Sequence, residues 1–218
     1  MKYTSNTYKN AINIITNAAK DYKQILSNQN FIFIFKNRND NSIDYFEAVF
    51  LDRNFQHLTG IDFTDTNGKI LHKSLYFYKK CLNGKIKENE ISYKADGTTE
   101  LKLKALPLII NFLNSSKMTA TYNSFKPKLS VDRLVGTTNF CIGFTKDKDF
   151  FVPSSCLLED IRNLSDVTHQ ILAIYSKSSN NKKTVYNNLR YIAKGITIEK
   201  LNMSDGLKTL IGLSKNNI

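Results

Sequence analysis

Histidine is the residue type in this sequence that is best suited to acid–base chemistry, and the chain contains three: His57, His72 and His169. An imidazole titrates near neutral pH, so it can take up and release a proton. His57 lies in Phe55–Gly60, where apolar neighbours and a Thr-Gly turn can hold the ring while one edge stays wet. His57 is therefore the first candidate for a general acid or base, with packing as the alternative. His72 is expected on an exposed helix face, and His169 is expected to be structural.

A ribonuclease that uses no metal needs few groups besides such a histidine, because RNA carries its own nucleophile. The enzyme must deprotonate the 2′-hydroxyl group, neutralise the phosphorane and protonate the leaving 5′-oxygen. The predicted sheet can supply fixed cations and hydroxyl groups for this purpose, namely Lys126, Lys128, Arg162, Lys177, Tyr175 and Ser176. For each of these residues taken alone, a solvated surface position is the alternative.

The sequence lacks other catalytic signatures. It has no Gly-rich phosphate loop, HExxH, CxxC or GxSxG motif, and its carboxylates do not cluster as a two-metal nuclease requires. The cysteines Cys81, Cys141 and Cys156 are widely spaced, which is typical of buried free thiols in a reducing cytoplasm. We therefore expect no metal site and no cofactor.

The charge balance points to an anionic partner. Lysine and arginine number 31 against 19 acidic residues, which gives a formal net charge of +12. A basic surface attracts polyanions, and nucleic acid is the usual one. The alternative is a compositional bias toward lysine and asparagine. No apolar run approaches the ~20 residues of a membrane helix and no secretory signal is visible, so we expect a cytoplasmic protein without a membrane partner.

The elements that must position these residues begin with helices. Apolar spacing of three and four predicts a helix over 4–28. An apolar run, a polar turn and a second strand over 31–51 predict a β-hairpin, whose aromatic residues are expected in the core rather than as a base-stacking platform. Further helices are predicted over 69–82 and from about 96 to 113, with Pro107 kinking the latter or delaying its start.

Period-two patterning over Ser116–Ser178 predicts an antiparallel sheet of about four strands. Its strands are expected over 118–122, 140–144, 150–152 (bounded by Pro153) and 171–175, and a short helix is expected over 185–194. The fold class is thus α+β, with N-terminal helices packed on a C-terminal sheet and with an added N-terminal helix and hairpin. The expected division is an N-terminal helix (1–30), an α+β domain (31–200) and a C-terminal tail (201–218).

Several short motifs together resemble a known family. They are Phe55–Gly60, the Phe-Tyr-x-x-Cys-Leu-Asn-Gly segment 77–84, the Asp-Gly-Thr-Thr-Glu-Leu-Lys-Leu segment 96–103 followed by Leu106-Pro107, and the later segments 126–129, 141–144, 152–153, 158–162 and 174–177. In order and spacing they resemble the fourth class of the phage Barnase–EndoU–Colicin–RelE-like nuclease domains, over about residues 31–200.

The resemblance implies a barnase/RelE-like core of helices followed by a four-stranded antiparallel sheet. It also implies a metal-independent endoribonuclease of phages and other mobile elements that acts in the bacterial cytoplasm. His57 and Thr59 match the family's His-Leu-Thr-Gly segment and are carried over as candidate site residues. Some members of this superfamily bind without cleaving.

Three functional hypotheses follow. In the first, a ribonuclease uses His57 as general acid or base, Thr59 as an orienting or phosphate-binding hydroxyl, and Tyr175 and Ser176 in support. Its phosphate clamps are Lys126, Lys128, Arg162 and Lys177, and a cognate antitoxin is a possible partner. The second is a non-catalytic, anti-CRISPR-like phage inhibitor that binds a host defence nucleoprotein complex. The third is a plain RNA- or DNA-binding module. The oligomeric state stays open.

Overall fold

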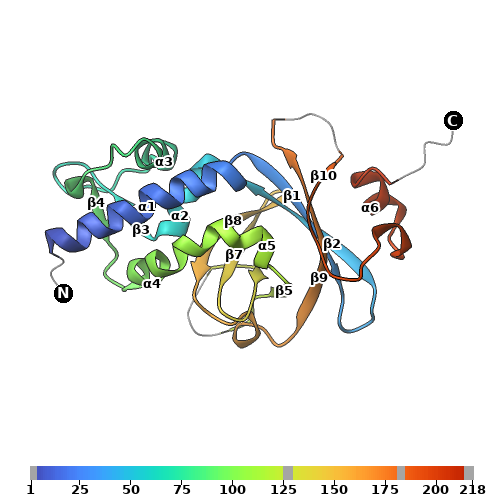
Figure 1. The fold of residues 1–218 in the computed structure, drawn as a ribbon. Helices are drawn as coiled ribbons and strands as arrows, with labels where there is room; N and C mark the ends of the chain where they lie inside the picture. The colour runs from blue at the N-terminus through green and yellow to red at the C-terminus, as the bar shows by residue number, and fades with distance from the viewer. Residues whose placement is uncertain (1–3, 125–129, 181–184, 214–218) are drawn as a thin grey trace.

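The computed structural model describes residues 4–124, 130–180 and 185–213, and its path is drawn in Figure 1. The helices are α1 (Ser5–Ile25), α2 (Phe55–Thr59), α3 (Ser74–Leu82), α4 (Thr98–Ala105), α5 (Phe112–Ser115) and α6 (Asp205–Leu210). The strands are β1 (Gln29–Lys36), β2 (Ile43–Phe50), β3 (Ile61–Phe63), β4 (Ile91–Tyr93), β5 (Met118–Thr121), β6 (Arg133–Gly136), β7 (Cys141–Asp147), β8 (Phe150–Leu157), β9 (Thr168–Ser178) and β10 (Asn188–Ile192).

A single sheet of eight strands organises the described residues, in the order β1-β2-β8-β7-β6-β5-β9-β10. A further antiparallel pairing of β1 with β9 closes seven of these strands into a barrel and leaves β10 outside the ring. The sheet is mixed, because β2 and β8 run parallel where Ala48 pairs with Phe151. The short strands β3 and β4 form a separate sheet.

The predicted fold, an open antiparallel sheet of about four strands with the first helix and the hairpin as additions, is wrong. The hairpin β1–β2 lies within the sheet, between β9 and β8. The reason is visible in β1, whose two faces are both apolar. Phe31, Phe33 and Phe35 pack into the main core, and Ile32 and Ile34 pack into a second cluster on the other face. A strand buried on both faces is stable only inside a sheet.

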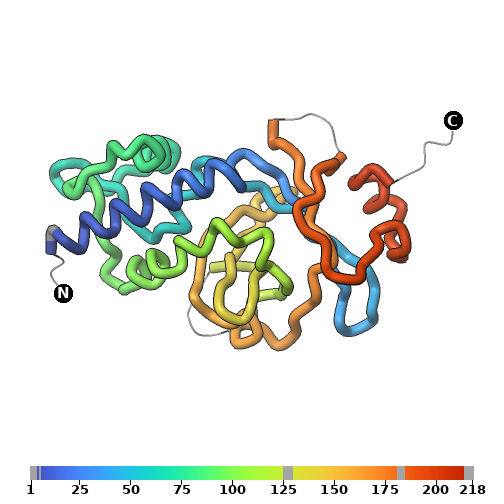
Figure 2. Tube along the Cα trace, viewed as in Figure 1, coloured from blue at the N-terminus to red at the C-terminus, as the bar shows by residue number. Residues whose placement is uncertain are grey.

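The helices lie mainly toward one end of the barrel, and the C-terminal segment lies toward the other (Figures 1 and 2). The predicted first helix is confirmed as α1, which buries Ala11, Ile15 and Tyr22 in the main core. The Tyr22 hydroxyl also donates to the carbonyl oxygen of Leu51 at 2.8 Å. At the other end, Leu207 of α6 packs in the second cluster. The proposed division at residues 30 and 200 stays a prediction.

Two local predictions are tested by the structure, and one strand was missed. The kink at Pro107 is confirmed, because α4 ends at Ala105 and a 3-10 segment containing the proline follows over Leu106–Asn111. The helix predicted over 185–194 is wrong, because that segment forms β10 and pairs with β9. Strand β6 was not predicted at all. Apolar spacing over so short a segment is compatible with either element, and a free strand edge decides in favour of β10.

Pro153 does not end its strand, and the distortion it causes matters for the site. Phe144 pairs with Pro153 and Gly143 pairs with Ser155, so Ser154 is an extra residue in β8. Bulges of this kind redirect a residue and often lie next to functional sites. Here the carbonyl oxygen of Ser154 accepts a hydrogen bond from Lys102 Nζ at 3.4 Å.

In the described part of the chain, no helix has the length and apolar character needed to cross a bilayer.

Candidate active site

His57 and His72 face the same surface depression, at the helical end of the molecule. A hollow of about 530 Å3 is lined by both histidines together with Arg53, Asn54, Lys73, Ser74, Leu75, Tyr76 and Lys79. An adjoining hollow of about 360 Å3 is also lined by both histidines, and its other walls include Gln56, Asp62, Lys94, Lys102 and Ser154. We call this pair of hollows the histidine cleft. Its walls combine two imidazoles with several cations.

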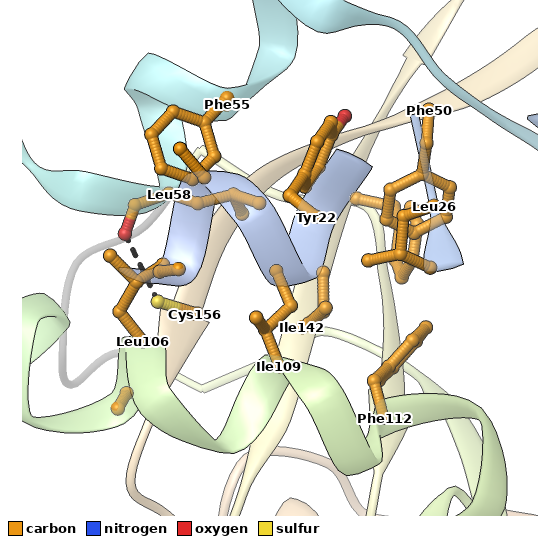
Figure 3. Packing of buried hydrophobic residues seen from close by; sticks show 14 of the residues in the cluster. Tyr22, Leu26, Phe50, Phe55, Leu58, Leu106, Ile109, Phe112, Ile142 and Cys156 are labelled. Atoms are coloured by element: carbon orange, nitrogen blue, oxygen red, sulfur yellow. Dashed lines mark hydrogen bonds between the residues drawn. The ribbon is translucent and has the colours of Figure 1, made fainter. Parts of the chain in front are cut away.

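The far side of α2 anchors His57 to the core. Phe55 and Leu58 are fully buried, and the Phe55 ring lies 5.4 Å from the ring of Tyr22 and 5.3 Å from that of Tyr78, centroid to centroid. Figure 3 shows Phe55 and Leu58 beside Tyr22, and its dashed line joins the carbonyl oxygen of Leu58 to the thiol of Cys156. Because these apolar residues face inward, His57 between them is exposed to solvent.

Side chains from distant elements hold the carbonyl groups at the end of α2, which would otherwise lack partners. Lys102 Nζ donates to His57 O at 2.8 Å, and Thr99 Oγ1 donates to Gly60 O at 2.6 Å. Cys156 Sγ donates to Leu58 O at 3.1 Å. The motifs around His57, around Thr99 to Lys102 and in β8 therefore meet at one turn, and together they fix where His57 lies.

Gly60 makes this close approach possible. Its φ is +67°, the left-handed conformation that commonly follows a helix and favours glycine. A Cβ atom at this position would lie 2.9 Å from Cδ of Lys102 and 3.1 Å from Cα of Thr99. A side chain here would therefore push α4 away from the His57 turn.

Electrostatics favour the neutral form of His57. The surroundings remove enough water from the exposed ring to lower its pKa below the ordinary 6.5, and the charges of Lys102 and Lys94 lower the pKa further. Burial also lowers the pKa of Lys102. A histidine that is neutral at physiological pH has a free lone pair, so it is able to accept a proton from a substrate.

One acceptor in the cleft is unsatisfied. Gln56 Nε2 donates to Ile61 O at 3.3 Å, while Gln56 Oε1 is buried and has no hydrogen-bond partner among the described residues. Buried polar atoms normally have partners.

Of the predicted site residues that the structure describes, only His57 lines the histidine cleft. Thr59 lies directly beneath it but is fully buried. Its hydroxyl donates to Gln56 O at 2.8 Å and accepts from the Ile61 amide at 3.1 Å. Thr59 therefore shapes the turn and does not reach the surface.

The other predicted residues within the described ranges lie on different parts of the molecule. Tyr175, Ser176 and Lys177 lie on β9: Tyr175 packs against the second cluster, Ser176 is fully buried, and Lys177 Nζ lies 4.4 Å from the ring centroid of Tyr186. Arg162 is exposed and paired with Asp160 at 2.6 Å. Lys126 and Lys128 lie outside the described residues.

Sequence reasoning missed the second histidine and most of the cations of the cleft. His72 was assigned to an exposed helix face, whereas it precedes α3, which begins at Ser74. A usable signal was the segment between residues 69 and 102, which is rich in lysine and contains few carboxylates. Among the residues the structure describes, no group of three or more His, Cys, Asp or Glu side chains is arranged to hold a metal ion.

Comparison with known proteins adds one match. No curated protein and no solved structure matches the chain. The family model described as phage-Barnase-EndoU-ColicinE5/D-RelE like nuclease4 matches residues 14–194, which includes the histidine cleft and begins within α1. Because that match spans most of the 218 residues and agrees with the motifs gathered around His57, the chain belongs to this family of phage-type nuclease domains.

Proposed function

We propose that the protein is a ribonuclease that cleaves RNA without a metal ion, in the histidine cleft. The observation that carries the proposal is that His57 and His72 line the same two hollows. Two imidazoles at one phosphodiester are able to serve as general base and general acid. Membership of a nuclease family supports cleavage of a phosphodiester.

The reaction uses the 2′-hydroxyl group as nucleophile. Neutral His57, whose pKa is lowered, takes the 2′-hydroxyl proton while the 2′-oxygen forms a bond to phosphorus. The bond between phosphorus and the 5′-oxygen breaks, and protonated His72 gives its proton to that oxygen. The products are a 2′,3′-cyclic phosphate and a 5′-hydroxyl group. Both protons are thus accounted for by the two rings.

Cations around the cleft would stabilise the negative charge of the phosphorane. Lys94 and Lys102 line one hollow, and Arg53 and Lys73 line the other. Fixed positive groups aimed at developing charge are often the largest contribution to catalysis. Among the described residues, Asp62 is the only carboxylate on the walls, which supports acid–base catalysis over a site built on carboxylates. Thr59 would support His57 through the turn.

The decisive experiment compares RNA with DNA. Purified protein is incubated in EDTA with a labelled single-stranded RNA and with DNA of the same sequence, and the product ends are analysed. We expect cleavage of RNA alone, with cyclic phosphate and 5′-hydroxyl ends. Equal cleavage of DNA, or loss of cleavage in EDTA, would contradict the mechanism. Tight RNA binding with no cleavage would favour a non-catalytic inhibitor or RNA-binding module instead.

A further inference from the structure

A second basic hollow continues the histidine cleft along α3. It measures about 570 Å3 and is lined by Tyr76, Lys79, Lys80, Asn83, Lys85 and Lys87. Tyr76 and Lys79 also line the hollow that contains His57 and His72. The two hollows therefore meet at Tyr76 and Lys79, and one surface leads from the histidines past Tyr76 to Lys87. We call the part from Tyr76 to Lys87 the lysine track.

Tyr76 is unusual among the aromatic residues that the structure describes, because 53% of its surface is exposed. Its ring lies 6.0 Å from the buried ring of Phe63, centroid to centroid, and Lys80 Nζ lies 5.7 Å from its centroid. The contact with Phe63 limits the freedom of the ring, while the remaining exposed surface is open to a ligand. An exposed aromatic ring in a basic groove is the arrangement that proteins use to stack unpaired bases.

The charges of the track are available to phosphates. Lys79, Lys85 and Lys87 are exposed, and none of them forms an ion pair with a described residue. Lys80 is the exception, because it pairs with Glu90. Three unpaired ammonium groups beside an exposed ring match the alternation of phosphate and base in a nucleic-acid strand.

We propose that the lysine track binds single-stranded RNA, with one base stacked on Tyr76 and the adjoining phosphates held by Lys79, Lys85 and Lys87. Bases in a duplex are stacked on one another and present no free face to Tyr76, so a duplex would gain only the phosphate contacts. Because Tyr76 shares a hollow with His57 and His72, the stacked base lies next to the scissile phosphate. That placement rests on the ribonuclease function proposed above, whereas the binding does not.

Binding is tested with a 2′-O-methyl oligonucleotide of 12 residues, which cannot be cleaved through its 2′-oxygen. Its affinity for the full-length protein is measured by fluorescence anisotropy, alone and annealed to its complement. We expect Tyr76→Ala to weaken single-strand binding by about 5- to 150-fold and Tyr76→Phe to bind as the wild type does. Leu189→Ala, a change at a similarly exposed apolar residue on β10, is the matched control and should have no effect.

The proposal is overturned by equal affinity for duplex and single strand, or by wild-type affinity of Tyr76→Ala. Failure of the wild type to bind the single strand would also overturn it. Salt dependence gives a second measure. Affinity falls as salt rises, and each lost phosphate contact reduces the steepness of log affinity against log salt by about 0.7 for single strands. Lys85→Gln and Lys87→Gln should each lower the slope, whereas Lys194→Gln and Lys200→Gln, exposed lysines beyond β10, should not.

The position of the stacked base is tested separately with a cleavable RNA in which an abasic nucleotide is moved along the sequence. At the position beside the cut, loss of the base should slow cleavage by the wild type but not by Tyr76→Ala, since that variant has no ring to stack. If the abasic scan has no such position while cleavage still needs His57, the stacking proposal fails alone. If Tyr76-dependent binding is found but no cleavage, the ribonuclease proposal fails alone.

Discussion

His57 and His169 line different hollows and differ in the contacts that their rings make. Both rings line a basic hollow, and both have a lowered pKa. Yet His169 Nδ1 accepts a hydrogen bond from the Arg38 amide at 3.1 Å, and its ring lies 5.4 Å from that of Phe35. The ring of His57 has no hydrogen bond to any described residue. The free ring is the one able to serve a substrate.

The contrast shows that a shifted pKa is insufficient to identify a catalytic group. Burial lowers the pKa of His169 first and Arg133 lowers it further, while Asp44 and Asp40 oppose the shift. For His57 the two charges that act are both positive, from Lys102 and Lys94. Structural networks also perturb titration. A phosphate is attracted to the second environment, where both charges that shift the pKa of the ring are positive.

The largest expected effect separates the histidines of the cleft from His169. Replacing His57 or His72 with alanine should lower the rate of RNA cleavage by about 10²- to 10⁴-fold, the usual contribution of a general acid or base. His169→Ala should keep the wild-type rate and lose stability by about 0.5–1.5 kcal/mol, because one hydrogen bond is removed. Initial rates and thermal melts measure the two effects. Equal loss of activity in all three variants would contradict the distinction between catalytic His57 and His72 and structural His169.

Next in size is the anchor of the His57 turn. Lys102→Met removes the bond to His57 O and the charge that lowers the pKa of His57. We expect cleavage to slow by roughly ten- to a hundredfold, because a misplaced catalytic group is costly. The acid limb of the pH–rate profile should also move to higher pH. Lys104→Met, an exposed lysine on the same helix, is the control. A slower Lys102→Met enzyme with an unmoved acid limb would assign Lys102 a purely structural role.

A smaller effect is expected from the hydroxyl of Thr99. Thr99 Oγ1 donates to Gly60 O and accepts from the Lys94 amide at 2.9 Å. Thr99→Val keeps the shape and leaves both groups unpaired, which should destabilise the fold by about 1–3 kcal/mol. Chemical denaturation measures this, with Thr98→Val on the neighbouring, less buried residue as control. An unchanged free energy of unfolding would show that the turn does not depend on this bond.

The smallest effect is on the pH dependence of stability. His57 and His169 each have a lower pKa in the folded protein than in the unfolded chain, so protonation favours the unfolded chain. Their stabilisation is present above the ordinary pKa of 6.5 and is lost as pH falls below it, through the lowered folded values. His57→Gln and His169→Gln should each flatten the fall in the free energy of unfolding in that window. Urea titrations from pH 7.5 to about 5 test this; a steeper fall in either variant would contradict it.

Local patterns predicted elements better than their partners. The apolar run Phe31–Phe35 was correctly expected in a buried strand. That it pairs with β9, a strand more than a hundred residues away in sequence, and thereby closes the sheet, depends on long-range contacts that no local period encodes. Likewise Pro153 indicates an irregularity but does not reveal whether the strand ends or bulges.

The candidate site was predictable from sequence only where a residue of a suitable type also had informative neighbours in the sequence. His57 stood out because a histidine between apolar residues and a Thr-Gly turn is constrained. His72 has no such context, and the role proposed for it follows only from the structure, in which it lines the same two hollows as His57. Tyr175 and Lys177 were placed near His57 because a single small sheet was assumed, whereas the barrel puts them at its other end.

The support of the His57 turn by β8 has a consequence for how the protein is made. The thiol of Cys156 and the carbonyl group of Leu58 are 98 residues apart in sequence. At a synthesis rate of about 5–20 residues per second, the turn leaves the ribosome roughly 5–20 s before its last support exists. During that interval the nascent turn has the bonds from Thr99 and Lys102 within reach but not the bond from Cys156, so the supports of His57 are added in stages as the chain is made.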